Sequence, residues 1–198
     1  MKPRLIVVAG PNGAGKTTIT EKLLRHEWMD GCTYINPDII AQEKFGGWNS
    51  QEAIIKAAEY AQKIREECLA SMQSMAFETV FSIQEKMWFL QQAKEAGFFV
   101  RFFFICTNDP SINAQRIAFR VMEGGHDVPI TKIINRYYRS INNCVKAVAM
   151  ADRAYFYDNS INNVDPIQLF RTVKGKIVKF YTELPPWAKD VSEQIAVE

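Results

Sequence analysis

Histidine and cysteine are scarce in this chain of 198 residues, and their spacing excludes an ordinary zinc site. The sequence holds 2 histidines and 4 cysteines, and no two cysteines lie closer than 36 residues, so it contains no Cys-x-x-Cys pair. Tetrahedral zinc needs four such ligands, which usually come in closely spaced pairs. We therefore expect free thiols and a reducing compartment.

Long hydrophobic runs and runs of one charge are also missing. The apolar run at the N-terminus stops after Ala9, and the other candidate, Phe98 to Cys106, is interrupted by Arg101. A membrane-spanning helix needs about 20 apolar residues, so we expect no membrane association and a cytoplasmic location. The 24 Lys and Arg residues nearly balance 22 Asp and Glu residues. Without a cluster of like charges, nucleic acid is not an expected partner.

No linker rich in Pro, Gly or Ser divides the chain, and no internal repeat is visible. A chain of this length, with 47% hydrophobic residues, can bury one core of its own. We therefore expect a single domain over residues 1–198.

Short apolar runs alternate with segments of helical periodicity. Strands are expected at Leu5–Ala9, Thr33–Ile35, Met75–Val80, Phe98–Cys106, Ala154–Tyr157 and Lys176–Tyr181. Helices are expected at 16–26, at 49–72 lying on the sheet, at 82–97 with a capping box from Ser82 to Glu85, at 109–122, and from 131 onward. The alternation predicts an α/β fold of three layers, α/β/α, with a mainly parallel sheet.

Residues 10–17 read Gly-Pro-Asn-Gly-Ala-Gly-Lys-Thr and match G-x-x-x-x-G-K-[ST] between an expected strand and an expected helix. Such a P-loop turns its backbone N–H groups inward, toward the oxygens of a triphosphate. ATP is the expected ligand, held by Gly10, Asn12, Gly13, Ala14, Gly15, Lys16, Thr17 and Thr18. Lys16 supplies a positive charge to the phosphates, and the hydroxyl of Thr17 is the candidate ligand of Mg²⁺.

A P-loop identifies the phosphate donor and leaves the acceptor open. The chain has neither an LSGGQ-like signature nor an N/T-K-x-D guanine motif, so transporter ATPases and GTPases are disfavoured. A small-molecule kinase is the leading interpretation. The alternatives are a regulatory NTP-binding ATPase switch and, with less support, a polynucleotide 5'-kinase.

Two carboxylates follow expected strands, at the edge where ligands bind in parallel sheets. Asp38 follows Asn36-Pro37, and Glu78 ends an otherwise apolar strand. Asp38 is the candidate general base, and Glu78 is a candidate contact for the acceptor. A cap or turn role for Asp38 and a structural salt bridge for Glu78 are the alternatives.

A segment around residues 110–140 is expected to form a lid that closes on the phosphates. Arg120 and Arg136 are the favoured arginines for contacting the transferring phosphoryl group, ahead of Arg116 and Arg139. His126, in the loop between the two helices, is a candidate contact for the substrate. The sequence 158–160, Asp-Asn-Ser, follows another strand and is expected to form a plain turn.

These motifs together resemble the zeta toxin family, in its compact bacterial branch. The resemblance runs from about Leu5 to Ser160 and rests on residues 10–18, 36–38, 77–79, 124–129, 136–137 and 158–160. The family has a P-loop kinase fold, and its characterised toxins use ATP and Mg²⁺ to phosphorylate the 3'-hydroxyl of the sugar in UDP-N-acetylglucosamine.

The resemblance implies a role for each matching residue. Asp38 matches the general base, Lys16 and Thr17 match the phosphate and metal contacts, and Glu78 matches the carboxylate that holds the sugar. Arg120 falls near a phosphate-contacting arginine of the lid, and His126 or Arg136 stands where better-known members place a second one. The family's toxins are usually restrained by an antitoxin, which we expect here as a separate protein.

Overall fold

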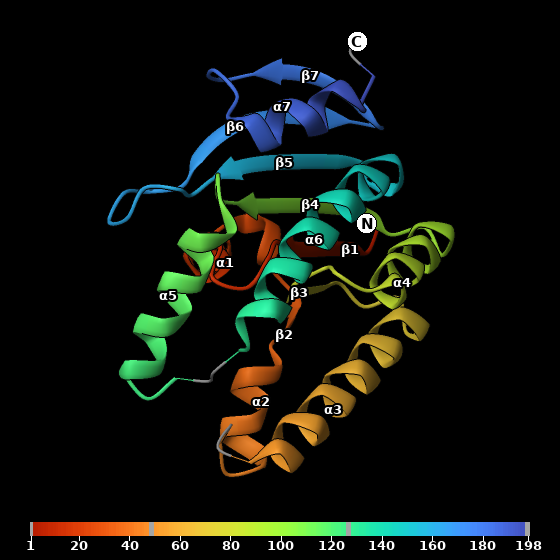
Figure 1. The fold of residues 1–198 in the computed structure, drawn as a ribbon. Coiled ribbons are helices and arrows are strands. Elements are labelled where there is room, and N and C mark those ends of the chain that lie inside the picture. The colour runs from red at the N-terminus through yellow and green to blue at the C-terminus, as the bar shows by residue number, and fades with distance from the viewer. Residues whose placement is uncertain (1, 48–49, 126–127, 197–198) are drawn as a thin grey trace.

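The computed structural model describes residues 2–47, 50–125 and 128–196. A seven-stranded sheet in the order β2-β3-β1-β4-β5-β6-β7 runs through the molecule (Figure 1). The strands are β1 (Arg4–Ala9), β2 (Thr33–Ile35), β3 (Met75–Thr79), β4 (Phe99–Cys106), β5 (Arg153–Asp158), β6 (Ile167–Val173) and β7 (Lys176–Phe180). The strands from β2 to β5 pair in parallel, and β6 and β7 add an antiparallel hairpin.

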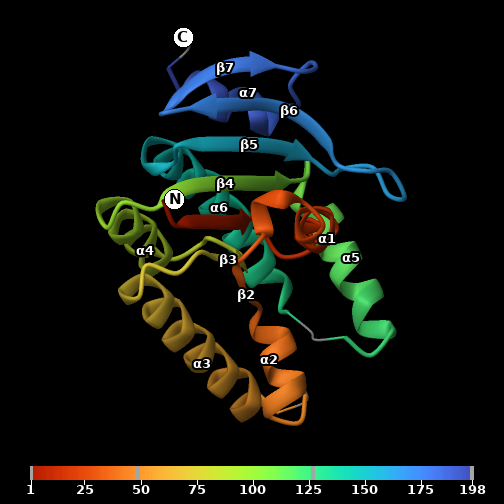
Figure 2. The same cartoon turned by 180° about the vertical axis from the view of Figure 1, so that it is seen from behind.

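The helices cover the two faces of this sheet unequally. They are α1 (Lys16–Leu24), the short 3₁₀ helix η1 (Glu27–Met29), α2 (Pro37–Lys44), α3 (Gln51–Ala70), α4 (Gln84–Glu95), α5 (Pro110–Met122), α6 (Ile130–Met150) and α7 (Pro186–Glu193). Figure 1 shows α4, α6 and α7 in front of the sheet, and Figure 2 shows α1 on the opposite side. None of the helices in the described ranges is both long and apolar enough to cross a membrane.

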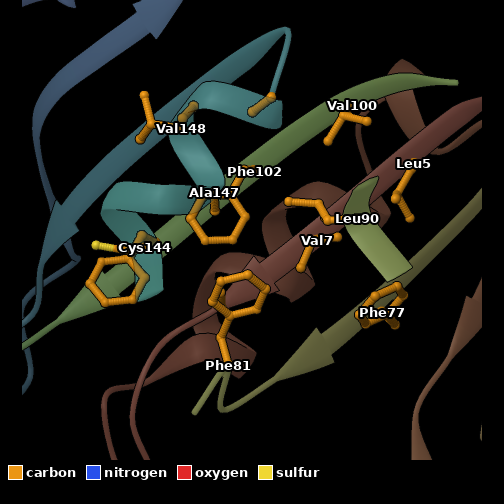
Figure 3. Close-up of a cluster of buried hydrophobic side chains, with 14 of the residues drawn as sticks. Leu5, Val7, Phe77, Phe81, Leu90, Val100, Phe102, Cys144, Ala147 and Val148 are labelled. Atoms are coloured by element: carbon orange, nitrogen blue, oxygen red, sulfur yellow. The ribbon is translucent and has the colours of Figure 1, made fainter. Parts of the chain in front are cut away.

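Alternating side chains of the central strands fill two separate cores, because successive residues of a strand point to opposite faces. Leu5, Val7, Phe77, Phe102 and Phe104 pack under α4, α6 and α7, together with the buried Leu90 and Ala147 of those helices (Figure 3). Ile6, Val8, Phe103 and Ile105 pack under α1 and η1. The central strands are therefore buried on both faces, which explains their uninterrupted apolar sequence.

The expected three-layer fold with a mainly parallel sheet is confirmed, and each expected strand is present within one residue at either end. Asp109 caps α5, with its carboxylate accepting from the N–H of Ser111 at 2.7 Å, as the sequence predicts. The sequence analysis does not predict α2, β6 or α7. These are short or moderately polar elements that acquire their apolar contacts only from the rest of the fold.

One local expectation is wrong, and another holds only in part. The capping box at Ser82 does not form, because Phe81 buries its ring, adopts a φ of 58° and turns the chain, so that α4 starts only after Ile83 and has no side-chain cap. The helix α3 contacts β2 and adds Ala57, Ala61 and Cys68 to the core against the sheet, but it also extends beyond β2 and packs along α2 (Figure 1).

Candidate active site

The carboxyl ends of β1, β3 and β4 meet at one edge of the sheet, and the P-loop lies there between β1 and α1. Gly10 makes a close backbone approach: a Cβ on it would lie 2.0 Å from the carbonyl oxygen of Ile105. Gly15 precedes α1 with a φ of 85°, and a Cβ there would meet the side chain of Asn159 at 2.1 Å. No side chain caps α1, so the N–H groups of its first turn remain available to an anion.

Polar side chains from neighbouring loops hold the P-loop backbone from outside. Asn113 on α5 donates to the carbonyl of Asn12 at 2.6 Å, and Asn159 after β5 donates to the carbonyl of Ala14 at 2.8 Å. These bonds occupy two carbonyl oxygens of the P-loop and fix its backbone. The sequence does not predict Asn113, and at residues 158–160 it favours a plain turn over a lining of the nucleotide side. A polar residue just past a strand end is the signal that singles out Asn159.

The ammonium of Lys16 lies against the loop and forms no salt bridge with a described carboxylate. It donates to the carbonyl oxygens of Gly10 and Pro11 at 3.1 and 3.0 Å. Burial lowers the pKa of Lys16 to about 8, while the charge of Glu78 acts in the opposite direction. A desolvated cation held among carbonyl groups in this way is stabilised when an anion such as phosphate binds beside it.

The side chains expected to form the site are close enough to act electrostatically on Lys16. The carboxylates of Glu78 and Asp38 raise the pKa of Lys16, and the guanidinium groups of Arg120 and Arg136 lower it. These four residues come from β3, α2, α5 and α6. The fold therefore brings these four charged side chains within electrostatic range of Lys16.

Asp38 lies in the first turn of α2, and its carboxylate is not the cap of that helix. Asn36 is the cap: its side-chain oxygen accepts from the N–H of Asp38 at 2.9 Å. The Asp38 side chain is exposed to solvent. The alternative role of Asp38 as a cap is therefore wrong, because Asn36 fills it and leaves the carboxylate available.

Glu78 is held by a hydrogen-bonded chain that begins at the same asparagine. The amide of Asn36 donates to the hydroxyl of Tyr34 at 3.0 Å, and that hydroxyl donates to the Oε1 of Glu78 at 3.0 Å. Burial and the charge of Glu78 raise the pKa of Tyr34, so its hydroxyl stays a donor. In the described part of the chain Glu78 makes no salt bridge, which removes the structural alternative for this carboxylate.

Two of the candidate arginines touch the P-loop directly. Arg136 donates to the side-chain oxygen of Asn12 at 3.2 Å. Arg116 donates to Asn162 at 2.9 Å and lies 3.4 Å from the carbonyl of Gly13, so it approaches the loop more closely than its lower rank in the sequence analysis predicts. Arg120 and Arg139 are exposed, and His126 lies outside the described residues.

The site suits a nucleoside triphosphate better than a metal ion held by protein ligands alone. The uncapped N-terminus of α1 and the desolvated Lys16 ammonium fit phosphate oxygens. The residues that the structure describes contain no group of three or more His, Cys, Asp or Glu side chains able to hold a metal. Mg²⁺ fits nevertheless, since this ion keeps several waters and needs few protein ligands, and the exposed Thr17 would provide one.

The fold and the loop together define a P-loop nucleotide-binding protein. The sequence profile of a family described as AAA domain matches residues 5–140, and the chain belongs to that family. No protein of curated function matches the sequence.

Solved structures with a similar fold include one from a toxin-antitoxin system, a complex with ATP and a putative kinase. A structure from the PezAT chromosomal toxin-antitoxin system of Streptococcus pneumoniae matches with a TM-score of 0.62 and 18% identity over 98% of this chain and 78% of that chain. A structure of AvrRxo1-ORF1:-ORF2 with ATP matches with a TM-score of 0.70 and 17% identity over 96% of this chain. This chain spans only 64% of that protein's length. A putative kinase from Chloroflexus aurantiacus matches with a TM-score of 0.52 and 19% identity over 72% of this chain and 80% of that chain.

These similarities confirm the expected P-loop kinase fold, and with it the resemblance to zeta toxin-like kinases at the level of the fold.

Proposed function

We propose that the protein is an ATP-dependent kinase that transfers the γ-phosphoryl group to a hydroxyl of a small molecule, and that this acceptor is a nucleotide sugar such as UDP-N-acetylglucosamine. One observation carries the proposal. The carboxylates of Asp38 and Glu78 lie near enough to Lys16 of the P-loop to raise its pKa. A phosphate cradle, together with carboxylates that form no salt bridge within the described chain, is what transfer to a hydroxyl requires.

In this proposal the triphosphate lies along the P-loop. Its oxygens accept from backbone N–H groups and from Lys16, and the binding residues are Gly10, Asn12, Gly13, Ala14, Gly15, Lys16, Thr17 and Thr18. Thr17 would hold Mg²⁺, which when bound neutralises charge on the phosphates. The Asn12 side chain is positioned by Arg136.

Asp38 acts as the general base. As the acceptor oxygen bonds to the γ-phosphorus, its proton passes to the Asp38 carboxylate, and the bond from that phosphorus to the bridging oxygen breaks to release ADP. Lys16, Arg120 and Arg136 supply positive charge around the transferring group. The segment around residues 110–140, which carries both arginines, serves as the lid.

Glu78 accepts hydrogen bonds from hydroxyl groups of the acceptor, and the hydroxyl of Tyr34 fixes one of its carboxylate oxygens. This arrangement leaves the other oxygen for the substrate. A vicinal pair of sugar hydroxyls suits an oriented carboxylate, which favours a sugar-containing acceptor. His126 is proposed as a further substrate contact on the sequence pattern alone.

We also propose a separate antitoxin protein as a partner. Support comes from the structures with a similar fold, of which one belongs to a toxin-antitoxin system and another is a two-component complex. Purification of the tagged protein from its native host should recover a second small protein that protects the P-loop from nucleotide. Recovery of the chain alone, with an open ATP site, would count against this partner.

The proposal is tested by ATP turnover with a panel of UDP-sugars. We expect ADP release to depend on one member of the panel and to be slow without it. Rapid ATP hydrolysis that no added acceptor changes would instead favour the regulatory ATPase.

Nucleotide affinity should depend on pH because Lys16 must be protonated to bind phosphate. With a pKa of about 8 in the free protein, the ammonium is charged at pH 7 and largely neutral at pH 9, so the Kd for ATP should rise by about tenfold over that range. Calorimetry at pH 8 in buffers of different ionisation enthalpy should show proton uptake on binding. Phosphate groups are fully ionised by then, and a flat affinity without proton uptake would contradict the assignment.

The chain from Asn36 to Glu78 predicts distinct effects for two substitutions. Tyr34→Phe removes the bond to Glu78 and keeps the cap of α2, so the KM of the acceptor should rise by about tenfold while ATP binding is unchanged. Asn36→Ser keeps a capping hydroxyl but cannot reach Tyr34, and should behave in the same way. Asn36→Ala also removes the cap and should lower the free energy of unfolding by about 1 kcal/mol. An unchanged acceptor KM in Tyr34→Phe would show that Tyr34 does not position Glu78.

A further inference from the structure

The side of the sheet that carries α1 is covered only in part. Trp28 and Met29 of η1 pack with Ile6, Val8 and Phe103, but within the described chain Figure 2 shows no helix in front of β5, β6 and β7 on this side. An antiparallel sheet edge can face water when its outward side chains are polar. The charge of those side chains is unusual here.

Among the described residues of β4, β5, β6 and β7, every charged side chain on this face of the sheet is positive. The strand register places Arg101 of β4 beside Arg153 of β5, and Arg171 of β6 beside Lys179 of β7. Lys176 of β7 lies in the same row across the sheet as Arg101 and Arg153. We call this set, Arg101, Arg153, Arg171, Lys176 and Lys179, the basic face. The sequences of β1, β4, β6 and β7 contain no Asp or Glu, and Asp158 of β5 bonds Trp187 of α7 on the opposite side.

The basic face is not neutralised from within the described chain. None of its members takes part in the salt bridges found there, although other surface lysines do. The guanidinium of Arg101 instead stacks 3.9 Å from the ring centre of Trp28, and the Nε atoms of Arg101 and Arg171 have no hydrogen-bond partner. Burial lowers the pKa of Arg101, and Arg153 acts in the same direction.

Like charges placed directly across two strands destabilise a sheet. The pairs Arg101 with Arg153 and Arg171 with Lys179 therefore cost stability unless an external anion compensates them. The chain as a whole has a formal charge of only +2, so this is a local segregation of charge and not a generally basic surface. An anionic partner is the simplest source of compensation.

We propose that the basic face binds an acidic helix of a partner protein, at a surface distinct from the P-loop. Neighbouring strands lie about 4.8 Å apart, and successive turns of an α-helix about 5.4 Å. Carboxylates on two successive turns of a helix lying across the strands would meet Arg101 and Arg153 on β4 and β5. Further turns would meet the cations of β6 and β7, where Lys176 lies in the same row and Arg171 and Lys179 lie in the adjacent one. Guanidinium groups suit such carboxylates because they can donate to both oxygens.

A single-stranded nucleic acid fits this surface less well. Its bases need several aromatic rings to stack on, and few are accessible here. Tyr155 is 6% exposed and stacks on Phe103 at 4.7 Å. The half-buried Trp28 lies against the guanidinium of Arg101. The exposed Tyr181 lies beside Lys179, at the β7 edge of the face. The proposal does not depend on the kinase activity, and its test uses no ATP.

The test measures binding of a fluorescein-labelled, alanine-based helical peptide that carries glutamates along one face. The full-length protein should bind it, more weakly as salt increases, and should not bind the peptide with glutamine at the same positions. The double variant Arg153→Glu/Lys179→Glu should bind at least tenfold more weakly. The control Lys146→Glu/Lys189→Glu changes the net charge equally at exposed positions on other elements and should bind as the unchanged protein does.

A second readout separates lost binding from lost structure. Because Arg153→Glu places a carboxylate beside Arg101, the double variant should unfold at the same or a higher temperature than the unchanged protein. Equal peptide binding by the two double variants, or no binding by the unchanged protein, would overturn the proposal. Tighter binding of oligothymidylate than of the peptide, lost in the same variant, would also overturn it and would identify nucleic acid as the partner class.

Discussion

Lys16→Met is expected to abolish both ATP binding and turnover. The ammonium is the only side-chain cation that the structure places inside the described P-loop, and no neighbouring donor occupies the same position. At a ligand concentration 100-fold above Kd, ATP should stabilise the unchanged protein by about 2.7 kcal/mol. Thermal unfolding of the variant should show no such shift.

The same substitution should leave a signature in the free protein. The pKa of Lys16 falls from 10.5 to about 8 on folding, so between these values the unfolded chain binds more protons than the folded one. The free energy of unfolding therefore rises with pH between about 8 and 10.5. Below pH 8 the folded protein holds a buried, charged ammonium, and this lowers its stability in full. Relative to Lys16→Met, the unchanged protein should gain on the order of 2 kcal/mol from pH 8 to 10.5, a figure reduced for partial exposure. A pH-independent difference would show that Lys16 is not desolvated.

Asp38→Asn is expected to lose phosphoryl transfer and keep ATP binding. A positioned general base contributes about 10² to 10⁴ in rate, so kcat should fall by at least a hundredfold. The carboxylate repels phosphate, and its removal should leave the Kd for ATP unchanged or slightly lower. Single-turnover transfer and nucleotide binding measured on the same preparation separate the two effects.

The control for Asp38 is Asp190→Asn, an exposed aspartate on α7. It should transfer phosphate at the unchanged rate. If Asp38→Asn does so as well, Asp38 is not the base. If it loses ATP affinity together with transfer, its role is structural support of the loop.

The parts of the fold that the sequence predicts best are those governed by local rules. The run from Leu5 to Ala9 reads as a buried strand because each residue is apolar, and the P-loop follows from its glycines and lysine. Asp109 and Pro110 set the start of α5 by capping and by a fixed φ. In these segments the local sequence and the tertiary contacts favour the same structure.

The parts that it does not predict depend on long-range contacts. Asn113 and Asn159 reach the P-loop over separations in the sequence of 101 and 145 residues. Nothing local marks Asn113, and the position of Asn159 just past a strand end does not say which loop it supports. Asn36 could be recognised as a turn residue, but its link through Tyr34 to Glu78 exists only because β2 pairs beside β3. The direction of α3 likewise depends on α2, which fills the space at the sheet edge.

The central claim is that a bound triphosphate and an acceptor hydroxyl meet at one site, and mass spectrometry tests it most directly. The protein would be incubated with ATP, Mg²⁺ and a bacterial metabolite extract, beside the Lys16→Met and Asp38→Asn variants. We predict a small molecule, with a UDP-sugar as the first candidate, that gains one phosphate group only with the unchanged protein. ATP consumption without any phosphorylated metabolite, or the same product from Asp38→Asn, would contradict the account.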